Sequence, residues 1–306
     1  MIVVGGESLV DLVPTEHGRL MDPTLGGGPY NAALAAGRLG SPTAFCSRLS
    51  TDRFGAELLA RLEESAVRTE LLQRGPEPTT MAVVSLDEQR TASYSFYVAG
   101  TADRMFTDPG PLPAEVTALS LASFGAMVLE PGASAYEVML HREAARGIVT
   151  MLDPNIRTAL ISDAEACRAR FRSWLPSVGV LKLSDVDAEW LAGDQPVEEA
   201  LEQWCASGPA AVVFTKGGDG IELRTPNGDR IEVPAVPVTV ADTIGAGDTV
   251  HGALLAWLDK NGIQDRAALE SLTAQQWSEA LRYAGKAASI TVSRVAAEPP
   301  YAAEMV

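Results

Sequence analysis

The chain has 306 residues, of which 46% are hydrophobic and 21% are charged. This composition is typical of a soluble globular protein with enough apolar material for a large core, so it excludes a disordered chain. The 40 Asp and Glu residues against 24 Lys and Arg residues give a formal net charge of −16, which disfavours nucleic acid and anionic membranes as partners.

The sequence also indicates the cellular compartment in which the protein is expected. The first residues lack the basic and apolar regions of an export signal, and no apolar run reaches the length of a membrane span. Three cysteines at wide spacing, Cys46, Cys167 and Cys205, form neither a disulfide framework nor a metal-ligand pattern. We therefore expect a cytoplasmic protein with reduced cysteines.

Short apolar runs alternate with helical patterns along most of the chain. The predicted strands cover residues 2–4, 43–48, 148–153, 180–184 and 211–215. Residues 54–65 have a helical pattern, in which Leu58, Leu59 and Leu62 share one face. This alternation predicts an α/β fold with a mostly parallel central sheet flanked by helices.

Two further segments, residues 9–25 and 83–100, are strand-like without helices. We predict that they form a small antiparallel sheet. Ligands of open α/β sheets bind outside the carboxyl ends of the strands, so this sheet can act as a lid. Residues 112–118 and 195–209 are predicted to be connectors with helical content. The chain is thus predicted to be one domain, residues 1–306, with a discontinuous lid.

A loop of small residues begins at Asp242 and runs through Gly245, Ala246 and Gly247 to Asp248, where a helical pattern starts. Small residues let backbone N–H groups converge on an anion, and a helix start adds positive potential. Asp248 could accept the proton of an attacking hydroxyl group. The alternative is that Asp248 only caps the helix. The loop is not a Walker loop, because no Gly-Lys-Ser/Thr sequence follows.

A second glycine-rich loop lies near the N-terminus, where Gly26, Gly27 and Gly28 precede Asn31 and an Ala-rich helical stretch. The glycines permit close approach of the backbone to a polyhydroxylated ligand, and the Asn31 amide can both donate and accept hydrogen bonds. The alternative is a tight loop before a packing helix. Asp11, which follows the first strand, has a carboxylate suited to two adjacent hydroxyl groups.

Together the two loops resemble the two signatures of the ribokinase-like, or PfkB-type, carbohydrate kinases, in the family's order. The resemblance implies transfer of phosphate from ATP to a sugar hydroxyl, with Asp248 as catalytic base and the amides of Gly245, Ala246 and Gly247 as anion hole. It assigns the sugar to Asp11, Gly27, Gly28 and Asn31.

Two other stretches of sequence indicate which sugar accepts the phosphoryl group. The sequence Asp153-Pro154-Asn155-Ile156-Arg157 and the lid sequence with Phe96 and Arg104 resemble bacterial fructokinases, which implies that Phe96, Arg104, Asn155 and Arg157 contact the sugar. Kinases of 2-keto-3-deoxygluconate share much of this pattern and are the alternative, followed by kinases of ribose or nucleosides. A sugar-sensing protein without turnover is a further class, but it would not need Asp248.

The resemblance also implies a nucleotide site and two cation sites. The residues implied to bind ATP are Lys182, Ser184, Thr215, Gly217, Gly218, Gly220, Gly247, Ala284 and Ala287. Asp187 is implied to organise Mg²⁺, and Asp242, Ile244 and Ser293 to bind K⁺. Ser184 and Asp187 replace the usual Asn and Glu, and Ala296 replaces a usual glycine, so both cation sites depart from the family pattern. A homodimer through the lid is also implied.

Overall fold

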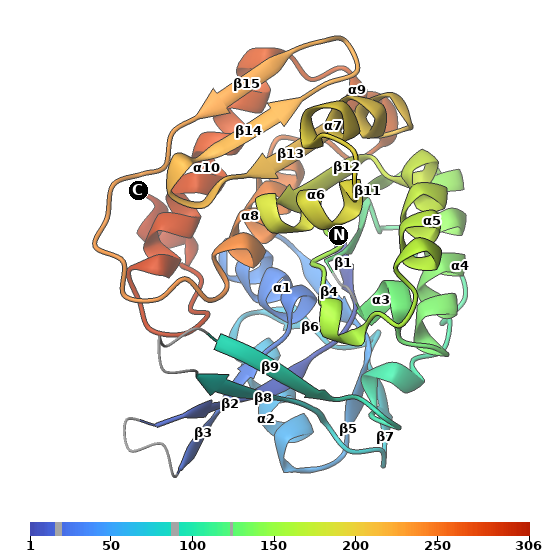
Figure 1. Ribbon diagram of the computed structural model, residues 1–306, viewed down its shortest axis with the longest axis vertical. Helices are drawn as coiled ribbons and strands as arrows, with labels where there is room; N and C mark the ends of the chain where they lie inside the picture. The colour runs from blue at the N-terminus through green and yellow to red at the C-terminus, as the bar shows by residue number, and fades with distance from the viewer. Residues whose placement is uncertain (16–19, 87–91, 123–124) are drawn as a thin grey trace.

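The fold is built around a nine-stranded sheet in the part of the chain that the structure describes (Figure 1). This computed structural model describes residues 1–15, 20–86, 92–122 and 125–306. The strands are β1 (Ile2–Gly5), β4 (Thr43–Cys46), β6 (Val67–Arg68), β10 (Ala118–Leu121), β11 (Val149–Leu152), β12 (Val180–Ser184), β13 (Ala211–Thr215), β14 (Ile221–Arg224) and β15 (Arg230–Val233).

The strand order is β15-β14-β13-β12-β11-β10-β1-β4-β6. All neighbours from β6 to β13 are parallel, whereas β13, β14 and β15 are joined in antiparallel fashion. Strands β1, β4, β10 and β11 are entirely buried, which explains their continuous apolar runs. The predicted mostly parallel α/β sheet is confirmed.

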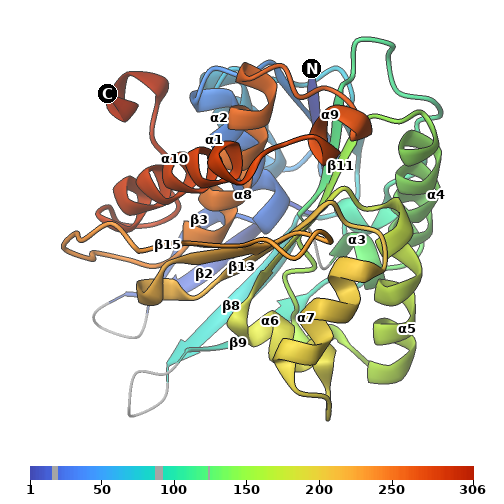
Figure 2. The same cartoon turned by 90° about the horizontal axis from the view of Figure 1, so that it is seen from above.

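Helices cover both faces of the sheet (Figure 2). One layer contains α1 (Gly28–Arg38), α2 (Arg53–Glu64), α8 (Ala246–Lys260), α9 (Arg266–Glu270) and α10 (Ala274–Val292). The other contains α3 (Gly125–Val128), α4 (Gly132–Ala145), α5 (Ala164–Trp174), α6 (Asp185–Ala192) and α7 (Val197–Ala206). Each layer has its own cluster of buried hydrophobic side chains against the sheet.

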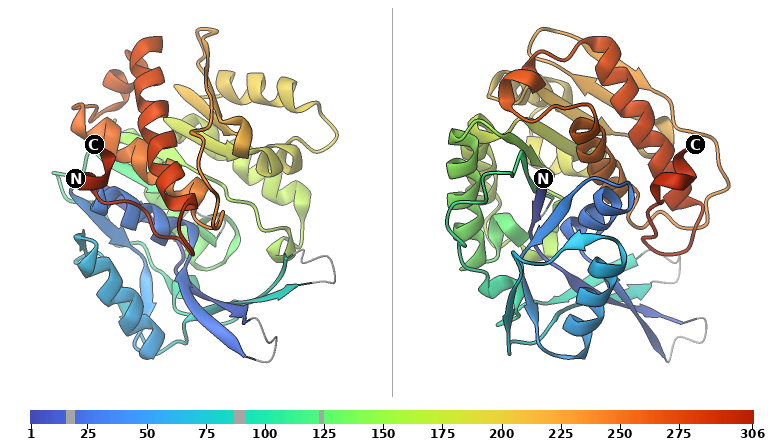
Figure 3. Two further views of the ribbon diagram at one scale, coloured as in Figure 1. Left: turned by 90° about the vertical axis from the view of Figure 1, so that its left-hand side faces the viewer. Right: turned by 180° about the vertical axis from the view of Figure 1, so that it is seen from behind.

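A separate four-stranded sheet projects from one end of the main body (Figure 3). Its order is β3-β2-β8-β9, with β2 (Leu9–Pro14), β3 (Met21–Gly26), β8 (Thr80–Leu86) and β9 (Ala92–Tyr97). The prediction of a purely antiparallel sheet is wrong, because β2 and β8 pair in parallel. The chain between them crosses the main body through α1 and α2, so β8 runs in the same direction as β2. Residues 16–19 and 87–91 of the predicted lid lie outside the described residues.

Three other expectations concern local structure. The helical content predicted for residues 195–209 is present as α7. Residues 112–118 contain no helix, and Ala118 instead begins the central strand β10, whose four residues were too short a pattern to predict. The predicted strand 43–48 divides into β4 and β5 (Arg48–Ser50), and β5 pairs with β7 (Gln73–Gly75) in a two-stranded sheet. In the described part of the chain, no helix is long and apolar enough to cross a bilayer.

Candidate active site

A cavity of about 1180 Å³ lies between the small sheet and the carboxyl ends of β11, β12 and β13. This is the edge where open α/β sheets bind ligands. The predicted site residues that line it are Asp11, Gly27, Gly28, Asn31, Phe96, Asn155, Arg157, Lys182, Ser184, Asp187, Thr215, Gly217, Gly218, Gly220, Ile244, Gly245, Ala246, Gly247 and Asp248. The structure therefore brings most of the predicted site into one cavity.

The two glycine loops meet inside this cavity. The amide Nδ2 of Asn31 donates a hydrogen bond of 2.9 Å to Oδ2 of Asp248, across a sequence separation of 217 residues. A Cβ atom at Gly28 would lie 2.2 Å from Nδ2 of Asn155 and 3.4 Å from Oδ1 of Asp248. Only a glycine allows the loop this close to both side chains.

The packing of α1 against α8 explains why these loops meet. Each loop leads into the start of one of these helices, and the two helices lie side by side. A Cβ atom at Gly252 would lie 2.4 Å from the carbonyl oxygen of Ala32 and 2.7 Å from Cβ of Ala35. The Ala-rich stretch after the first loop is therefore the surface on which α8 packs, and it brings both helix starts to the same place.

Burial changes the proton affinity of Asp248. It raises the pKa of this carboxyl to about 6, while the hydrogen bond from Asn31 and the charge of Lys182 act in the opposite direction. A carboxylate with this pKa is ionised at neutral pH, yet it is a stronger base than an exposed aspartate. The position of Asp248 in the cavity and its raised pKa both suit a proton acceptor.

A buried ion pair lies beside the start of α8. Nζ of Lys182 is 2.6 Å from Oδ2 of Asp153, and both side chains are almost completely buried. Burial acts to lower the pKa of Lys182, but the charge and hydrogen bond of Asp153 outweigh it, so the pKa is raised. A Cβ atom at Gly247 would lie 3.2 Å from Nζ of Lys182, so this glycine lets a permanent cation approach the helix start.

Sequence reasoning assigned no role to Asp153 or to His251, which lies behind this ion pair. Nε2 of His251 is 2.6 Å from Oγ of Ser120, and Nδ1 is 4.0 Å from Oδ2 of Asp153. Burial, together with the charge of Lys182, holds the pKa of His251 well below its ordinary value, so the ring is neutral. The sequence did contain one signal that Asp153 belongs to the site, because this residue directly follows the apolar strand β11.

A second carboxyl group with a raised pKa, that of Asp11, lines the cavity at β2. Burial raises the pKa of Asp11 to about 6, and the charge of Arg157 opposes the rise. A Cβ atom at Gly26 would lie 2.7 Å from Oδ2 of Asp11, so this glycine makes room for the carboxyl group. Asn155 has a left-handed backbone (φ 43°) and its N–H donates to Oδ1 of Asp153, a side-chain turn that directs the loop into the cavity.

Five predicted site residues do not line the cavity: Arg104, Asp242, Ala284, Ala287 and Ser293. Ala284 and Ala287 are fully buried, and the cavity wall on α10 is formed instead by Gly285, Ala288, Ser289 and Val292. Helical spacing explains the shift, because these four positions share one face, whereas Ala284 and Ala287 face the core. Arg104 lies in an adjoining small chamber.

The polar side chains that the resemblance assigns to cations already take part in hydrogen bonds within the protein. Both carboxyl oxygens of Asp187 already accept hydrogen bonds, one from Ile156 N and the other from N and Oγ of Ser184, in a capping box at the start of α6. In the described residues, no three His, Cys, Asp or Glu side chains are grouped to hold a metal ion. These residues do not fit a protein-held magnesium site.

The loop at Asp242 does lie beside the C-terminal segment, as the potassium site requires. Ala241 N and Asp242 N both donate to the carbonyl oxygen of Val292. However, the two carboxyl oxygens of Asp242 accept hydrogen bonds from the N–H groups of Ile244 and Ala296, and Oγ of Ser293 donates to Ile290. These contacts join the two segments, and potassium binding through backbone carbonyl oxygens stays a prediction.

A mostly parallel sheet, a separate small sheet and two glycine loops in one cavity are the features of a ribokinase-like small-molecule kinase. Residues 1–303 match the sequence profile of the pfkB family carbohydrate kinases. The chain belongs to this family, and is a phosphotransferase that acts on a sugar hydroxyl group.

The similar proteins agree with this assignment. The fructokinase of Rhizobium leguminosarum bv. trifolii is 37% identical over 280 residues, which cover 90% of this chain and 85% of that protein. The crystal structure of fructokinase with bound ATP from Xylella fastidiosa has a TM-score of 0.91 at 26% identity, covering 99% of this chain and 96% of that one. The fructokinase of Vibrio cholerae O395 in its fructose, ADP and calcium ion bound form has a TM-score of 0.83 at 26% identity, covering 97% and 94%.

Proposed function

We propose that the protein is an ATP-dependent fructokinase. The observation that carries this proposal is the 2.9 Å hydrogen bond between Asn31 and Asp248, because it places the acceptor loop and the base within reach of one ligand. The similar proteins named above are fructokinases, and one of them was solved with fructose and ADP. Fructose offers hydroxyl groups to the carboxylate of Asp11 and the amide of Asn31.

Asp248 acts as the general base in this proposal. Its ionised carboxylate accepts the proton of the sugar hydroxyl as that oxygen attacks the terminal phosphorus of ATP. Asn31 holds one carboxyl oxygen, Oδ2, and leaves Oδ1 for the hydroxyl group. The new bond joins the sugar oxygen to the phosphoryl group, the bond to the bridging oxygen breaks, and ADP leaves.

The start of α8 and Lys182 stabilise the transferred phosphoryl group. The first amides of a helix have no partners within the helix and carry partial positive charge, which here belongs to the small residues Ala246 and Gly247. Ala246 N donates a long bond of 3.3 Å to the carbonyl oxygen of Thr243, so this amide must exchange that contact for the phosphoryl oxygen. Lys182 adds a full charge that its ion pair with Asp153 keeps protonated.

The nucleotide lies along the other half of the cavity. The turn after β13, with Thr215, Gly217, Gly218 and Gly220, borders its phosphates and ribose, and the small residues on α10 leave space for adenine. Mg²⁺ bound to the ATP phosphates would supply charge neutralisation. K⁺ activation, a homodimer formed through the lid and a cytoplasmic location stay predictions.

A sugar panel tests the proposal. Purified protein is incubated with ATP, Mg²⁺ and separately with fructose, glucose, ribose, adenosine or 2-keto-3-deoxygluconate, and ADP release and the phosphorylated position are measured. Fructose should give the highest kcat/KM. A higher value for 2-keto-3-deoxygluconate would favour the alternative acceptor, and sugar binding without ADP release would indicate a sensor.

A further inference from the structure

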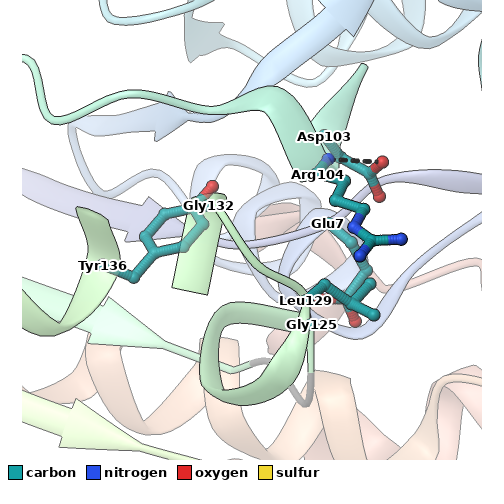
Figure 4. Close-up of a pocket in the computed structure, with 7 residues that line it drawn as sticks. All are labelled: Glu7, Asp103, Arg104, Gly125, Leu129, Gly132 and Tyr136. Carbon is teal, nitrogen blue, oxygen red and sulfur yellow. Dashed lines mark hydrogen bonds between the residues drawn. The ribbon is translucent and has the colours of Figure 1, made fainter. Parts of the chain in front are cut away.

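A small chamber opens from the acceptor end of the cavity, beside α3 and α4 (Figure 4). Its volume is about 10 Å³, which is the room that one water molecule or one hydroxyl group needs. The chamber and the main cavity share Glu7, Asp103, Gly125 and Leu129 as lining residues, so the two spaces are neighbours. No predicted sugar contact except Arg104 lies in this chamber.

Asp103 is the notable group in this chamber. Its carboxyl oxygen Oδ1 accepts hydrogen bonds from Thr80 Oγ1 (2.6 Å), Thr101 Oγ1 (2.9 Å) and Arg104 N (2.9 Å). The other oxygen, Oδ2, is buried and has no hydrogen-bond partner among the described residues. A buried carboxyl oxygen without a partner is costly, so a donor from a ligand is the expected complement.

The strand register places this oxygen at one end of the acceptor site. Asp11 and Leu9 lie on the same face of β2, and Leu9 is paired with Thr80 of β8. Thr80, whose hydroxyl group donates to Asp103, is thus paired with a position two residues, or about 7 Å, from Asp11 along β2. Asp248, in the first turn of α8, lies beside Gly28, because a Cβ atom at Gly28 would be 3.4 Å from its Oδ1 and 2.8 Å from the carbonyl oxygen of Ala122. Asp103 and Asp248 both line the main cavity but are held by different elements, so one sugar bound between them can contact both.

We propose that Asp103 is a specificity-determining residue, whose Oδ2 binds the hydroxyl group at the end of the sugar opposite the phosphorylated one. This inference rests on the proposed function. Fructose has a primary hydroxyl group at each end, C1 and C6, so either direction of binding supplies both groups. In 2-keto-3-deoxygluconate, C1 is a carboxylate, and it has no proton to donate.

Carboxyl and guanidinium side chains line the chamber. Glu7 and Asp103 contribute two carboxyl groups, against the single guanidinium group of Arg104, and Nε of that guanidinium donates to the carbonyl oxygen of Glu130. Figure 4 shows the side chains of these three residues close together, with Tyr136 on the far side.

The test is a double-mutant cycle between protein and substrate. kcat/KM is measured for fructose and for 1-deoxyfructose and 6-deoxyfructose, with the wild-type protein and with Asp103→Asn. One analogue lacks the phosphorylated hydroxyl group and is not turned over. The other lacks the hydroxyl group assigned to the chamber, and with wild-type protein it should lose about 10- to 100-fold in kcat/KM.

The same loss should be absent in Asp103→Asn, because the contact has already been changed. Asp108→Asn, a substitution in the same connecting segment at a residue that pairs with Arg142 outside the cavity, should behave like wild type. If the loss caused by Asp103→Asn and the loss caused by the missing hydroxyl group multiply to within about twofold, the role of Asp103 is overturned. It is also overturned if wild-type protein uses the analogue as well as it uses fructose.

The comparison of the deoxy analogue with fructose uses only wild-type protein, so it decides the question even if Asp103→Asn does not fold. Failure of the proposed function is separately visible, because wild-type protein would then not phosphorylate fructose. That result would overturn both proposals, whereas fructose turnover without coupling would overturn only this one.

Discussion

Replacing Asp248 by asparagine separates a catalytic role from a structural one. Asparagine keeps the shape of the side chain and can still pair with Asn31, so the loops should stay together. Loss of a general base lowers kcat by about 10² to 10⁴, which corresponds to about 3 to 5 kcal/mol of barrier. The KM for fructose should change little, because sugar binding depends on Asp11 and the first glycine loop.

The same substitution, Asp248→Asn, should increase the stability of the folded protein. The pKa of Asp248 is raised from 3.8 to about 6, so the folded chain binds this proton more tightly than the unfolded chain. Folding is therefore favoured by the neutral form below about pH 4, and this contribution is lost as the pH rises through about 6. The difference corresponds to about 3 kcal/mol at neutral pH. An asparagine, which has no charge to bury, should raise the melting temperature.

The assay combines coupled ADP release with thermal unfolding at neutral pH. Asp259→Asn, near the opposite end of α8 and outside the cavity, is the matched control and should resemble wild type in turnover. Turnover of Asp248→Asn within about tenfold of wild type would refute the assignment of the base. A low melting temperature together with low turnover would show that the side chain is structural.

Three further predictions follow from the site. In wild-type protein kcat/KM should fall as the pH drops through about 6, because Asp248 and Asp11 then become protonated; an unchanged value at about pH 5 would contradict this. Gly28→Ala should lower kcat/KM and cost about 1 to 3 kcal/mol of stability, because its Cβ would meet Asn155 and the backbone at Ala122; a crystal structure with an unmoved loop would contradict the steric reasoning. If the small sheet closes over fructose and an ATP analogue, amide exchange in β2, β3, β8 and β9 should slow when they bind, and unchanged protection would count against closure.

Much of the fold could be predicted because its signals are local. Buried parallel strands appear as apolar runs, helix α2 has its leucines at helical spacing, and glycine loops precede the helix starts. The direction of β2 relative to β8 could not be predicted. It depends on the path of the chain through the main body, and the alternation of side chains along a strand is the same in parallel and antiparallel pairs.

The sequence by itself determined the chemical types of the site: a carboxylate at a glycine-lined helix start, and an asparagine after a second glycine loop. Their meeting was decided only by the tertiary structure, in which small residues let α1 and α8 pack closely. The same holds for the partner of Lys182, the cavity-facing residues of α10 and the free oxygen of Asp103. Each depends on which side chains fold against it, and contacts across a long sequence separation leave no local pattern.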